Sequence, residues 1–509
     1  MRLATLLKNL EPAPRQVQRF DPSVDVTGLS IDSRRVQRGH VFVALPGQKA
    51  DGAKFAQDAW ERGAAVIVTE REEPLTGLPQ VIVPHARTAL AQLARALHGT
   101  PDKKLRLGAI TGTNGKSTTA YLVRHILNET RTPCGMLGTI EYDVGEPGAK
   151  LEAPLTTPEA PDICAYLRAM VRNGCKAAIM ETSSHGLVQR RVEGLQFSCG
   201  IFTNLTQDHL DFHRTMEQYR DAKLLLFQML DADAYAILNY DDEAGRYYAA
   251  RTRASTIGYS LENRREAELR AEITQTDIHG TTFRIHSPWG KREVRWGLVG
   301  AHNIQNALAG LGGALALGSS HDRTFNFDRA LSALEKFSGV PGRLEAVGDG
   351  LAPFRVLVDY AHTDDALRRV MAALRALKPS RLIVVFGAGG DRDRTKRPKM
   401  GRAVDEMADL GVVTSDNPRT ENPHAILRDI CEGLRTQGKF TIEADRARAI
   451  DLAVREARPG DVVLIAGKGH ENYQIVGAEK LPFDDRQQAR YALERRFGTA
   501  PRSAAAAGS

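Results

Sequence analysis

The stretch that decides the fold reads Ala109-Ile110-Thr111-Gly112-Thr113-Asn114-Gly115-Lys116-Ser117-Thr118. An apolar run leads into it, and an amphipathic run with Leu122, Val123, Ile126 and Leu127 follows it. This order predicts a strand, a phosphate-binding loop and a helix. Its glycines let backbone amides close around an anion, and the start of the helix adds partial positive charge. We therefore expect ATP to bind at Gly112, Thr113, Asn114, Gly115, Lys116, Ser117 and Thr118.

Two side chains of this loop suit a nucleoside triphosphate. Lys116 can reach the β- and γ-phosphates, and the hydroxyl of Ser117 can ligate Mg²⁺. The loop is shorter than the usual G-x-x-x-x-G-K-[ST], because Ile110 stands where the first glycine would be. A plain turn with a solvated lysine is the alternative interpretation. The flanking strand and helix favour nucleotide binding over that turn.

Length and composition bound the class of protein. A chain of 509 residues has room for three domains at ~150 residues each. Its 42% apolar and 26% charged residues are typical of a soluble globular protein. No run approaches the ~20 apolar residues of a membrane span, and Lys8 and Asn9 come too early for a secretory signal. We therefore expect a cytoplasmic protein.

Charge and cysteine usage exclude two further classes. The net charge is +7, but the basic residues are interleaved with 62 acidic ones and form no basic tract with stacking aromatics. This favours small polyanionic substrates over nucleic acid. Five scattered cysteines without C-x-x-C spacing indicate reduced thiols rather than zinc ligands or disulfides.

Along the chain, three α/β regions follow one another. Residues 1–103 contain candidate strands at 40–45, 64–69 and 80–83, followed by a helix that presents Leu90, Leu93 and Leu97 on one face. Alternating strands and helices over 104–340 predict a mostly parallel sheet. Residues 341–498 form the third region, and 499–509 read as a disordered tail.

The third region predicts a binding edge. Its candidate strands, 354–358, 382–386, 411–414 and 462–466, each run into a polar or glycine-rich tail, at 359–362, 387–393, 415–419 and 467–471. In open α/β sheets, ligands bind beyond the carboxyl ends of the strands. Four such tails on one edge therefore predict a site, whereas a single tail would be a loop.

The central region has polar residues in the same position relative to its strands. Glu181 ends a candidate strand at 176–180, and His209 follows one at 199–205. Mg²⁺ prefers hard oxygen ligands and tolerates an imidazole. Glu181 and His209, together with Ser117, therefore predict a metal cluster beside the phosphate loop. Either residue alone would more simply be structural.

Several motifs resemble the Mur ligase family. They are Gly-Thr-Asn-Gly-Lys-Ser-Thr from 112, Glu-Thr-Ser-Ser-His-Gly-Leu from 181, Thr-Asn-Leu-x-x-Asp-His-Leu-Asp-x-His from 203 and Gly-Ala-His-Asn-Ile-Gln-Asn from 300. Asp-Tyr-Ala-His-Thr from 359, Gly-Gly-Asp-Arg-Asp from 389 and Asp-Asn-Pro-Arg from 416 narrow the likeness to the MurE branch. The resemblance runs from about Leu29 to Gln474.

The resemblance implies an ATP-dependent amide ligase with three domains: a small N-terminal α/β domain that binds the UDP substrate, a central P-loop-type ATPase domain with a mostly parallel sheet, and a C-terminal Rossmann-like domain. Such ligases activate a carboxylate as an acyl phosphate, which an amine then attacks. The substrate would be UDP-N-acetylmuramoyl-L-alanyl-D-glutamate, an intermediate of peptidoglycan synthesis. We expect a monomer that acts on small molecules.

The resemblance also assigns residues to the nucleotide and metal. Lys116, Glu181 and His209 would be catalytic, with Mg²⁺ held by Ser117, Glu181, His209 and Lys223. Lys223, in Tyr219-Arg-Asp-Ala-Lys223, would carry a carbamate formed from CO₂, although by itself it reads as a helix-surface lysine. Asn303 and Asn306 would lie near adenine, and Arg343 near the nucleotide.

Substrate contacts follow in the same way. The UDP substrate would contact Ile31, Ser33, Gln48, Lys49, Ala50, Thr156, Thr157, Ser183, Gln189 and Arg191. The incoming amino acid would lie among Arg392, Asp416, Asn417, Pro418, Arg419, Gly467 and Glu471. Asp-Asn-Pro-Arg is similar to the signature of the meso-2,6-diaminopimelate enzymes, and an arginine fork suits the distal carboxylate that distinguishes diaminopimelate from lysine.

Other functions stay open at this point. A lysine-adding ligase of the same branch and a folylpolyglutamate-type synthetase share the ATP site. Asp-Asn-Pro-Arg and the segment Ser30-Ile-Asp-Ser-Arg34 argue against both. A nucleotide switch or nucleic-acid-binding protein rests only on the basic charge. For Arg419, the structural alternative is that it caps a loop or pairs with Glu421.

Overall fold

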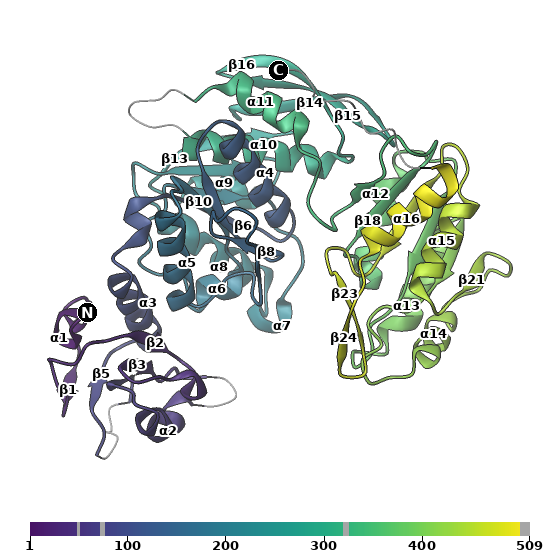
Figure 1. The fold of residues 1–509 in the computed structure, drawn as a ribbon. Coiled ribbons are helices and arrows are strands. Elements are labelled where there is room, and N and C mark those ends of the chain that lie inside the picture. The colour runs from purple at the N-terminus through teal and green to yellow at the C-terminus, as the bar shows by residue number, and fades with distance from the viewer. Residues whose placement is uncertain (48–50, 72–76, 319–324, 499–509) are drawn as a thin grey trace, which may run out of the picture. The chain divides into compact units, whose positions relative to one another are not determined.

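The computed structural model describes residues 1–47, 51–71, 77–318 and 325–498. The chain divides into two compact units. The first unit comprises 1–271 with 286–291 and 305–334, and the second comprises 272–285, 292–304 and the chain from 335 onward. Helices and strands alternate along much of the chain, with consecutive strands over 134–152, 255–296 and 473–482 (Figure 1).

The N-terminal part of the first unit is built on a five-stranded sheet with the order β1-β5-β4-β3-β2. All its pairs are parallel except β1–β5. The predicted strands at 40–45, 64–69 and 80–83 are β3, β4 and β5. The elements are α1 (Leu3–Leu7), β1 (Gln16–Gln18), β2 (Gly28–Ser30), η1 (Ser33–Arg35), β3 (His40–Val43), η2 (Gly52–Phe55), α2 (Ala56–Glu61), β4 (Val66–Thr69), β5 (Gln80–Ile82), α3 (Ala86–Leu97) and η3 (Pro101–Lys104).

The central part contains the strand, loop and helix expected at 109–118. Strand β6 lies between β11 and β10 in a parallel core with the order β13-β12-β11-β6-β10-β7, which the antiparallel β8 and β9 extend. Its elements are β6 (Arg106–Thr111), α4 (Lys116–Glu129), β7 (Cys134–Leu137), β8 (Glu141–Asp143), β9 (Leu151–Glu152), α5 (Ala160–Arg172), β10 (Ala177–Glu181), α6 (Ser184–Val188), β11 (Cys199–Phe202), α7 (Leu210–His213), α8 (Met216–Gln228), β12 (Tyr235–Asn239), α9 (Glu243–Ala249) and β13 (Ser255–Ser260).

Register explains why the polar residues of the central sheet share one edge. Glu181 on β10 pairs with Ile110 on β6, and Phe202 on β11 pairs with Thr111. The chain leaves all three parallel strands at about the same level, so the residues that follow them gather at the carboxyl edge. After β13 the chain continues with β14 (Leu269–Asp277), β15 (Gly280–Ser287), β16 (Gly290–Trp296), α10 (Ala301–Gly318) and α11 (Phe327–Lys336). The three strands extend the same sheet beyond β13.

The second unit contains a six-stranded sheet with the order β17-β18-β22-β19-β20-β21, in which only β17 is antiparallel. Its four predicted strands are confirmed as β18, β19, β20 and β22. The elements are β17 (Glu345–Val347), β18 (Arg355–Asp359), α12 (Asp364–Arg375), β19 (Leu382–Phe386), α13 (Lys396–Met407), β20 (Leu410–Val413), α14 (Pro423–Cys431), β21 (Phe440–Ile442), α15 (Arg446–Glu456), β22 (Val462–Ala466), β23 (Tyr473–Val476), β24 (Glu479–Pro482) and α16 (Asp485–Phe497).

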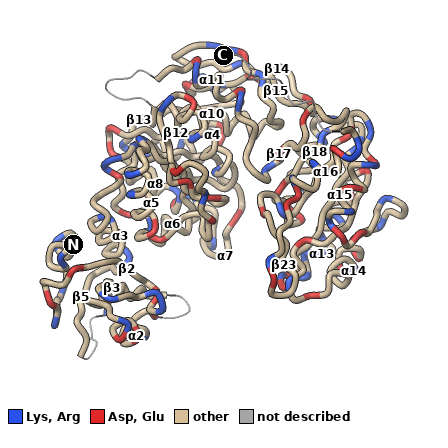
Figure 2. Tube along the Cα trace, viewed as in Figure 1, with Lys and Arg blue, Asp and Glu red and all other residues tan. Residues whose placement is uncertain are grey.

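Buried apolar side chains explain why these strands read as continuous hydrophobic runs. β19 and β22 are buried along their whole length, and separate apolar clusters cover the two faces of the sheet. Basic and acidic residues are interspersed along both units (Figure 2). Within the described part of the chain, no helix is long and apolar enough to cross a membrane. The predicted domain boundaries at 103/104 and 340/341 stay predictions, as does the tail at 499–509, which lies outside the described residues.

Candidate functional site

The phosphate loop joins β6 to α4 through two glycines with positive φ. Gly112 has φ +149° and Gly115 has φ +85°, a region that disfavours side chains. A Cβ at position 112 would lie 1.9 Å from Oγ1 of Thr203, so only glycine fits there. Lys116 donates from Nζ to the carbonyl oxygens of Gly112 at 3.0 Å and Thr113 at 2.9 Å. The side chain of Lys116 therefore folds back over the loop and binds its carbonyl oxygens.

Residues that follow β11 hold this loop in place. Asn204 accepts at Oδ1 from the backbone N of Asn114 at 3.0 Å, and its carbonyl oxygen accepts from the N of Thr113 at 2.8 Å. On the other side, a Cβ at Gly115 would lie 2.3 Å from Oδ1 of Asn306. Asn306 therefore packs directly against the loop, and its contact with adenine stays a prediction. The loop is held in shape by its surroundings.

Lys223 is a buried lysine at the phosphate loop. It lies on α8 with 1% of its surface exposed, and its Nζ donates to the carbonyl oxygen of Gly112 at 3.0 Å. The same Nζ lies 4.2 Å from the ring centroid of Tyr219, whose hydroxyl is 3.2 Å from Oγ1 of Thr113. Burial, and then the charge of Lys116, lower the pKa of Lys223 well below its ordinary value. Lys223 therefore loses its proton more readily than an exposed lysine does, and it is not the helix-surface lysine that its local sequence suggests.

Two of the four predicted protein ligands of Mg²⁺, Glu181 and His209, differ in their surroundings. Glu181 is 1% exposed and accepts from Thr139 twice: Oε1 from the backbone N and Oε2 from Oγ1, both at 2.9 Å. His209 is about half exposed and has φ +51°, and its ring lies 4.9 Å from that of His185. A carboxylate oriented by two donors and an accessible imidazole are each groups that can bind a divalent cation.

The described residues contain no group of three His, Cys, Asp or Glu side chains placed to hold a metal by themselves. The expected set has only two such residues, because Ser117 and the carbamate of Lys223 complete it. Ser117 is buried in the first turn of α4. This ligand set therefore stays a prediction.

The structure brings together five of the residues expected to bind the UDP substrate. Ser183 donates from N to Oγ1 of Thr157 at 2.9 Å, and Thr156 is 3.1 Å from Thr139 between hydroxyls. Arg191 donates to the carbonyl oxygen of Thr157 and to Oε1 of Gln189, both at 2.7 Å. Its Nε also lies 3.0 Å from Oε1 of Glu159, so a substrate anion would compete with that carboxylate.

The remaining expected contacts lie in the N-terminal part. Ile31 follows β2, and Ser33 begins η1, which Asp32 caps by accepting from the N of Arg34. Ser33 is 6% exposed. Gln48, Lys49 and Ala50 lie outside the described residues.

In the second unit, the expected amino-acid residues line one cavity of about 340 Å³ at the carboxyl ends of the strands. Because these residues come from loops that follow β19, β20 and β22, the parallel sheet explains how they meet. The cavity is also lined by Tyr360 and His362 from the predicted tail at 359–362, by Thr363, which ends the motif from 359, and by Lys396 and Arg397, which the sequence did not mark. The expected residues in its lining are Arg392, Asp416, Asn417, Arg419, Gly467 and Glu471, whereas Pro418 lies between two of them in the chain.

Arg419 has a left-handed backbone that strand β23 fixes. Its φ is +50°, and its N donates to the carbonyl oxygen of Ile475 at 3.0 Å. Gly477 donates to the carbonyl oxygen of Arg419 at 2.7 Å. The Nη1 of Arg419 donates to the carbonyl oxygen of Gly390 at 2.7 Å, and this bond uses one of the five guanidinium N–H groups. The arginine therefore does tie down a loop and retains donors toward the cavity.

Glu421, considered above as a partner of Arg419, instead pairs with two other arginines. It lies 2.8 Å from Nη2 of Arg397 and 2.9 Å from Nη2 of Arg394. The hydrogen bond from Arg397 is the largest of the causes that lower the pKa of Glu421 to about 2.

A buried lysine that the sequence did not reveal lies behind the cavity. Lys468 is 0% exposed and donates from Nζ to Oδ1 of Asn417 at 3.0 Å and Oε2 of Glu471 at 3.1 Å. Asn417 also donates from Nδ2 to Oε2 of Glu471 at 2.9 Å. The only available signal was its position in Gly467-Lys468-Gly469-His470-Glu471.

Two residues expected near the nucleotide also lie in the second unit. Asn303 donates from Nδ2 to the carbonyl oxygen of Val299 at 2.9 Å. The Cζ of Arg343 lies 5.3 Å from the ring centroid of Tyr360. Burial raises the pKa of Asp359, and the positive charge of Arg343 opposes that shift. Arg343 therefore stands beside a buried carboxylate that its charge stabilises.

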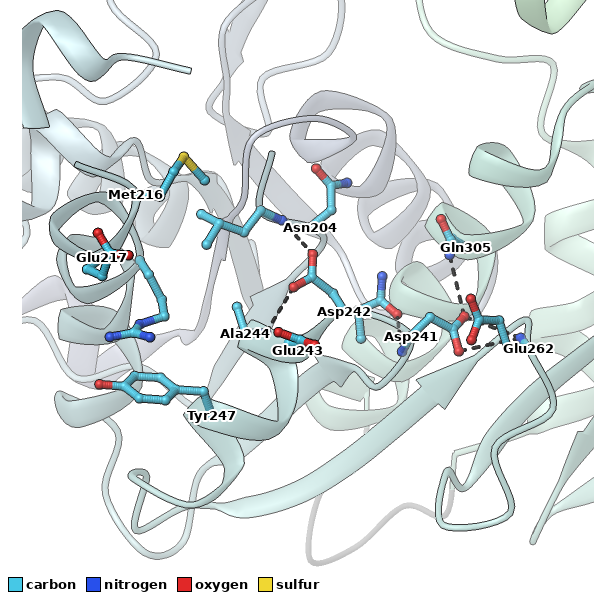
Figure 3. A pocket seen from close by; sticks show the side chains of 13 residues that line it. Asn204, Met216, Glu217, Asp241, Asp242, Glu243, Ala244, Tyr247, Glu262 and Gln305 are labelled. Atoms are coloured by element: carbon cyan, nitrogen blue, oxygen red, sulfur yellow. Dashed lines mark hydrogen bonds between the residues drawn. The ribbon is translucent and has the colours of Figure 1, made fainter. Parts of the chain in front are cut away.

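A second cavity, of about 660 Å³, lies in the first unit beyond β11 and β12 (Figure 3). Asp242 accepts at Oδ2 from the N of Leu205 at 2.7 Å and at Oδ1 from the N of Ala244 at 2.9 Å. Asp241 accepts from Oγ of Ser260 and from the N of Leu261. Asp242 caps α9, and Asp241 holds the chain at Ser260 and Leu261. Both carboxylates therefore have structural roles.

Comparison with known proteins gives consistent matches in all three regions. Family models described as "Mur ligase family, catalytic domain", "Mur ligase middle domain" and "Mur ligase, glutamate ligase domain" match residues 25–98, 110–314 and 342–469. These ranges include most of the motifs from which the resemblance was inferred.

Similar proteins cover nearly the whole chain. A UDP-N-acetylmuramoyl-L-alanyl-D-glutamate–2,6-diaminopimelate ligase of Gloeobacter violaceus is 46% identical over 93% of this chain and 95% of its own length. The Bacillus licheniformis protein of the same name is 42% identical over 97% and 99%. A solved structure of a ligase with that name is 32% identical, covers 98% of this chain and 100% of its own, and gives a TM-score of 0.72.

Proposed function

The chain belongs to the Mur ligase family, and from that membership we propose that it joins meso-2,6-diaminopimelate to the D-glutamate carboxylate of UDP-N-acetylmuramoyl-L-alanyl-D-glutamate, with ATP as co-substrate. The observation that carries this proposal is the cavity lined by Arg392, Asn417, Arg419 and Glu471. Relatives at 41–46% identity bear the name of the diaminopimelate-adding ligase. The reaction contributes to peptidoglycan precursor synthesis.

The chemistry requires activation of a carboxylate, because an amine cannot displace its oxyanion. A carboxylate oxygen of D-glutamate attacks the γ-phosphorus of ATP, ADP leaves and an acyl phosphate forms. The amine then attacks the acyl carbon, phosphate leaves and the nitrogen loses a proton. Gly112 to Thr118 hold the phosphates, and Lys116 neutralises charge that develops on them. The protein acts mainly by positioning and by charge compensation.

Residues beside the phosphate loop would hold Mg²⁺. The hydroxyl of Ser117, the carboxylate of Glu181 and the imidazole of His209 supply two hard oxygens and a nitrogen, a donor set that suits this ion. When bound, Mg²⁺ neutralises phosphate oxygens during transfer. Thr139 orients Glu181 through both carboxylate oxygens. The burial of Glu181, a carboxylate that accepts two hydrogen bonds from the neutral residue Thr139, supports this fit.

Lys223 carries a carbamate in this proposal. Its amine nitrogen attacks the carbon of CO₂, an N–C bond forms, and a proton is released to give an anion. Only the neutral amine is nucleophilic, and the lowered pKa of Lys223 increases the fraction of that form. The carbamate places an anion beside Lys116 that can bind the metal ion.

The UDP substrate contacts Thr156, Thr157, Ser183, Gln189 and Arg191. The hydrogen bonds among these residues support the assignment, because they hold hydroxyl and amide groups in fixed positions. The same substrate also contacts Ile31, Ser33, Gln48, Lys49 and Ala50. Adenine lies at Asn303 and Asn306, with Arg343 near the nucleotide.

Arg419 selects the amino acid. Its guanidinium can bind the distal carboxylate of diaminopimelate with two parallel hydrogen bonds, and Arg392 adds positive charge. Asp416 and Glu471 offer anions to the distal ammonium. L-Lysine lacks the distal carboxylate, so its binding leaves the buried fork without an anion. We place the reaction in the cytoplasm and expect a monomer.

The test is a ligation assay read by mass. The protein is incubated with UDP-N-acetylmuramoyl-L-alanyl-D-glutamate, ATP and Mg²⁺, together with either meso-diaminopimelate or L-lysine. We expect the mass of the diaminopimelate adduct, with one phosphate and one ADP released per product. Lys116→Ala is the control that removes nucleotide-dependent turnover. A lysine adduct formed in preference to the diaminopimelate adduct would overturn the assigned specificity, and no adduct at all would overturn the function.

A further inference from the structure

The buried cation behind the amino-acid cavity has no role in the reaction described so far. Lys468 is fully buried, yet it is absent from the lining of the 340 Å³ cavity that contains Asn417 and Glu471. Its neighbours in the chain, Gly467 and Glu471, do line that cavity. The lysine therefore lies one layer behind the residues that face the substrate.

The hydrogen bonds of Lys468 connect two cavity residues from different loops. Its Nζ donates to Oδ1 of Asn417 at 3.0 Å and to Oε2 of Glu471 at 3.1 Å. Nδ2 of Asn417 donates to the same Oε2 at 2.9 Å, which closes a three-membered ring of contacts. Asn417 comes from the loop after β20, and Glu471 from the loop after β22. The ring therefore fixes the two loops against each other.

The geometry assigns a direction to the carboxylate. Both bonds to Glu471 end on Oε2, and neither uses Oε1. The amide of Asn417 is fixed as well, because its Oδ1 also accepts from the N of Ile475 at 2.9 Å and its carbonyl oxygen accepts from Gly390. The glutamate side chain, which is 17% exposed, can present its other oxygen to the cavity.

We propose that Lys468 is a positioning residue for the amino-acid substrate. It holds Oε2 of Glu471 in the wall of the cavity, so that Oε1 accepts from the distal ammonium of the incoming amino acid. Lys468 also balances the negative charge of the largely buried Glu471 carboxylate. The other hydrogen bond to that carboxylate comes from the neutral amide of Asn417. This inference rests on the proposed function, because it takes the amino acid to bind in this cavity.

Removal of the lysine charge leaves Glu471 free to rotate and without its cation. A hydrogen bond to a charged group is stronger than one between neutral groups, so we expect Lys468→Met to raise the KM for the amino acid roughly 10- to 100-fold. We expect kcat to change less than about threefold, because the lysine contacts no reacting atom. The KM values for ATP and for the UDP substrate should stay at those of the wild type.

A double-mutant cycle with Glu471→Gln separates positioning from general damage. If Lys468 acts through Glu471, Lys468→Met adds little to the effect of Glu471→Gln. Lys468→Arg keeps the charge and should recover part of the lost affinity. The matched control is Lys378→Met, at an exposed lysine of the same unit, which should behave as the wild type. Lys468→Gln replaces the methionine variant in the cycle if the latter does not fold.

Three outcomes would overturn the inference: an amino-acid KM within twofold of the wild type, full additivity with Glu471→Gln, or equal rises in all three KM values. The wild-type assay tests the proposed function independently. If the wild type uses a different amino acid, the cycle is run with that amino acid, so the two hypotheses can fail separately.

Discussion

Lys116 and Lys223 share one acceptor: the Nζ of each lies 3.0 Å from the carbonyl oxygen of Gly112. Two ammonium groups at one carbonyl repel each other, and Lys223 is the more deeply buried of the two. Loss of the proton from Lys223 therefore costs less free energy than loss of the proton from Lys116. Accordingly, the pKa of Lys223 is well below its ordinary value. A lysine with a lowered pKa reacts more readily with CO₂, and the anion formed in this way would attract Lys116.

The first prediction concerns that lysine. Lys223→Ala should lower kcat roughly 100-fold or more, because the site loses the anion expected to hold the metal ion. Acetate or formate should restore part of the activity by supplying a small carboxylate to the vacated space. The measurement is the ligation rate against added carboxylate. Lys176→Ala, at an exposed lysine before β10, serves as the control and should need no rescue. Full activity of Lys223→Ala without added acid would exclude the carbamate.

The second prediction concerns the orientation of Glu181. Thr139→Val removes the hydroxyl that donates to Oε2 but keeps the backbone donor to Oε1. Outer-shell partners typically change metal affinity about 10- to 100-fold, so the Mg²⁺ concentration for half-maximal rate should rise by that factor. Direct binding of Mn²⁺, followed by electron paramagnetic resonance, should show the same loss. Thr139→Ser keeps the hydroxyl and should bind metal as the wild type does. An unchanged Mn²⁺ affinity of the valine variant would contradict the role of Thr139.

The third prediction concerns amino-acid selection. Arg419→Lys keeps the charge but removes the planar fork, so kcat/KM for diaminopimelate should fall about 100-fold, close to 2.7 kcal/mol. The preference over L-lysine should narrow accordingly, whereas the KM for ATP should not change. Arg448→Lys, at an exposed arginine on α15, is the matched control. Unchanged discrimination between the two amino acids would leave Arg419 with only its loop contact to Gly390.

The fourth prediction concerns pH. The pKa of Glu421 is lowered from 4.5 to about 2, first by its hydrogen bond from Arg397. A carboxyl with a depressed folded-state pKa stabilises the fold above its unfolded pKa, and that contribution is lost as pH falls. The wild type should therefore exceed Glu421→Gln in free energy of unfolding at pH 7, and the difference should shrink from about pH 4.5 toward pH 2. Urea unfolding at several pH values measures it. A difference that is constant with pH would show that the ion pair contributes nothing.

Local sequence was sufficient wherever a strand ran directly into a polar loop. The strands at 382–386 and 462–466 begin and end where the sequence predicts. A continuous run of β-branched and aliphatic residues is typical of a central strand that is buried on both faces of the sheet. The phosphate loop was equally local: its glycines and its lysine are adjacent in the chain. The amino-acid cavity followed from one further rule, that parallel strands end at the same edge of a sheet.

Contacts between distant segments were not accessible in this way. Lys468 reads as an ordinary lysine between two glycines, and only the folded sheet places its Nζ against Asn417, 51 residues earlier. Likewise, nothing near Arg419 in the chain indicates that Ile475 holds its left-handed backbone. Lys223 was assigned by resemblance, whereas its burial and its contact with Gly112 depend on how α8 packs.

The amino-acid sequence alone therefore determined the elements, the phosphate loop and the residue types at the candidate site, because periodicity and turn chemistry act over a few neighbouring residues. The tertiary structure decided which of those groups are buried, which share an acceptor and in which direction a carboxylate points. These properties depend on desolvation and on hydrogen bonds between segments that the chain brings together only when it folds.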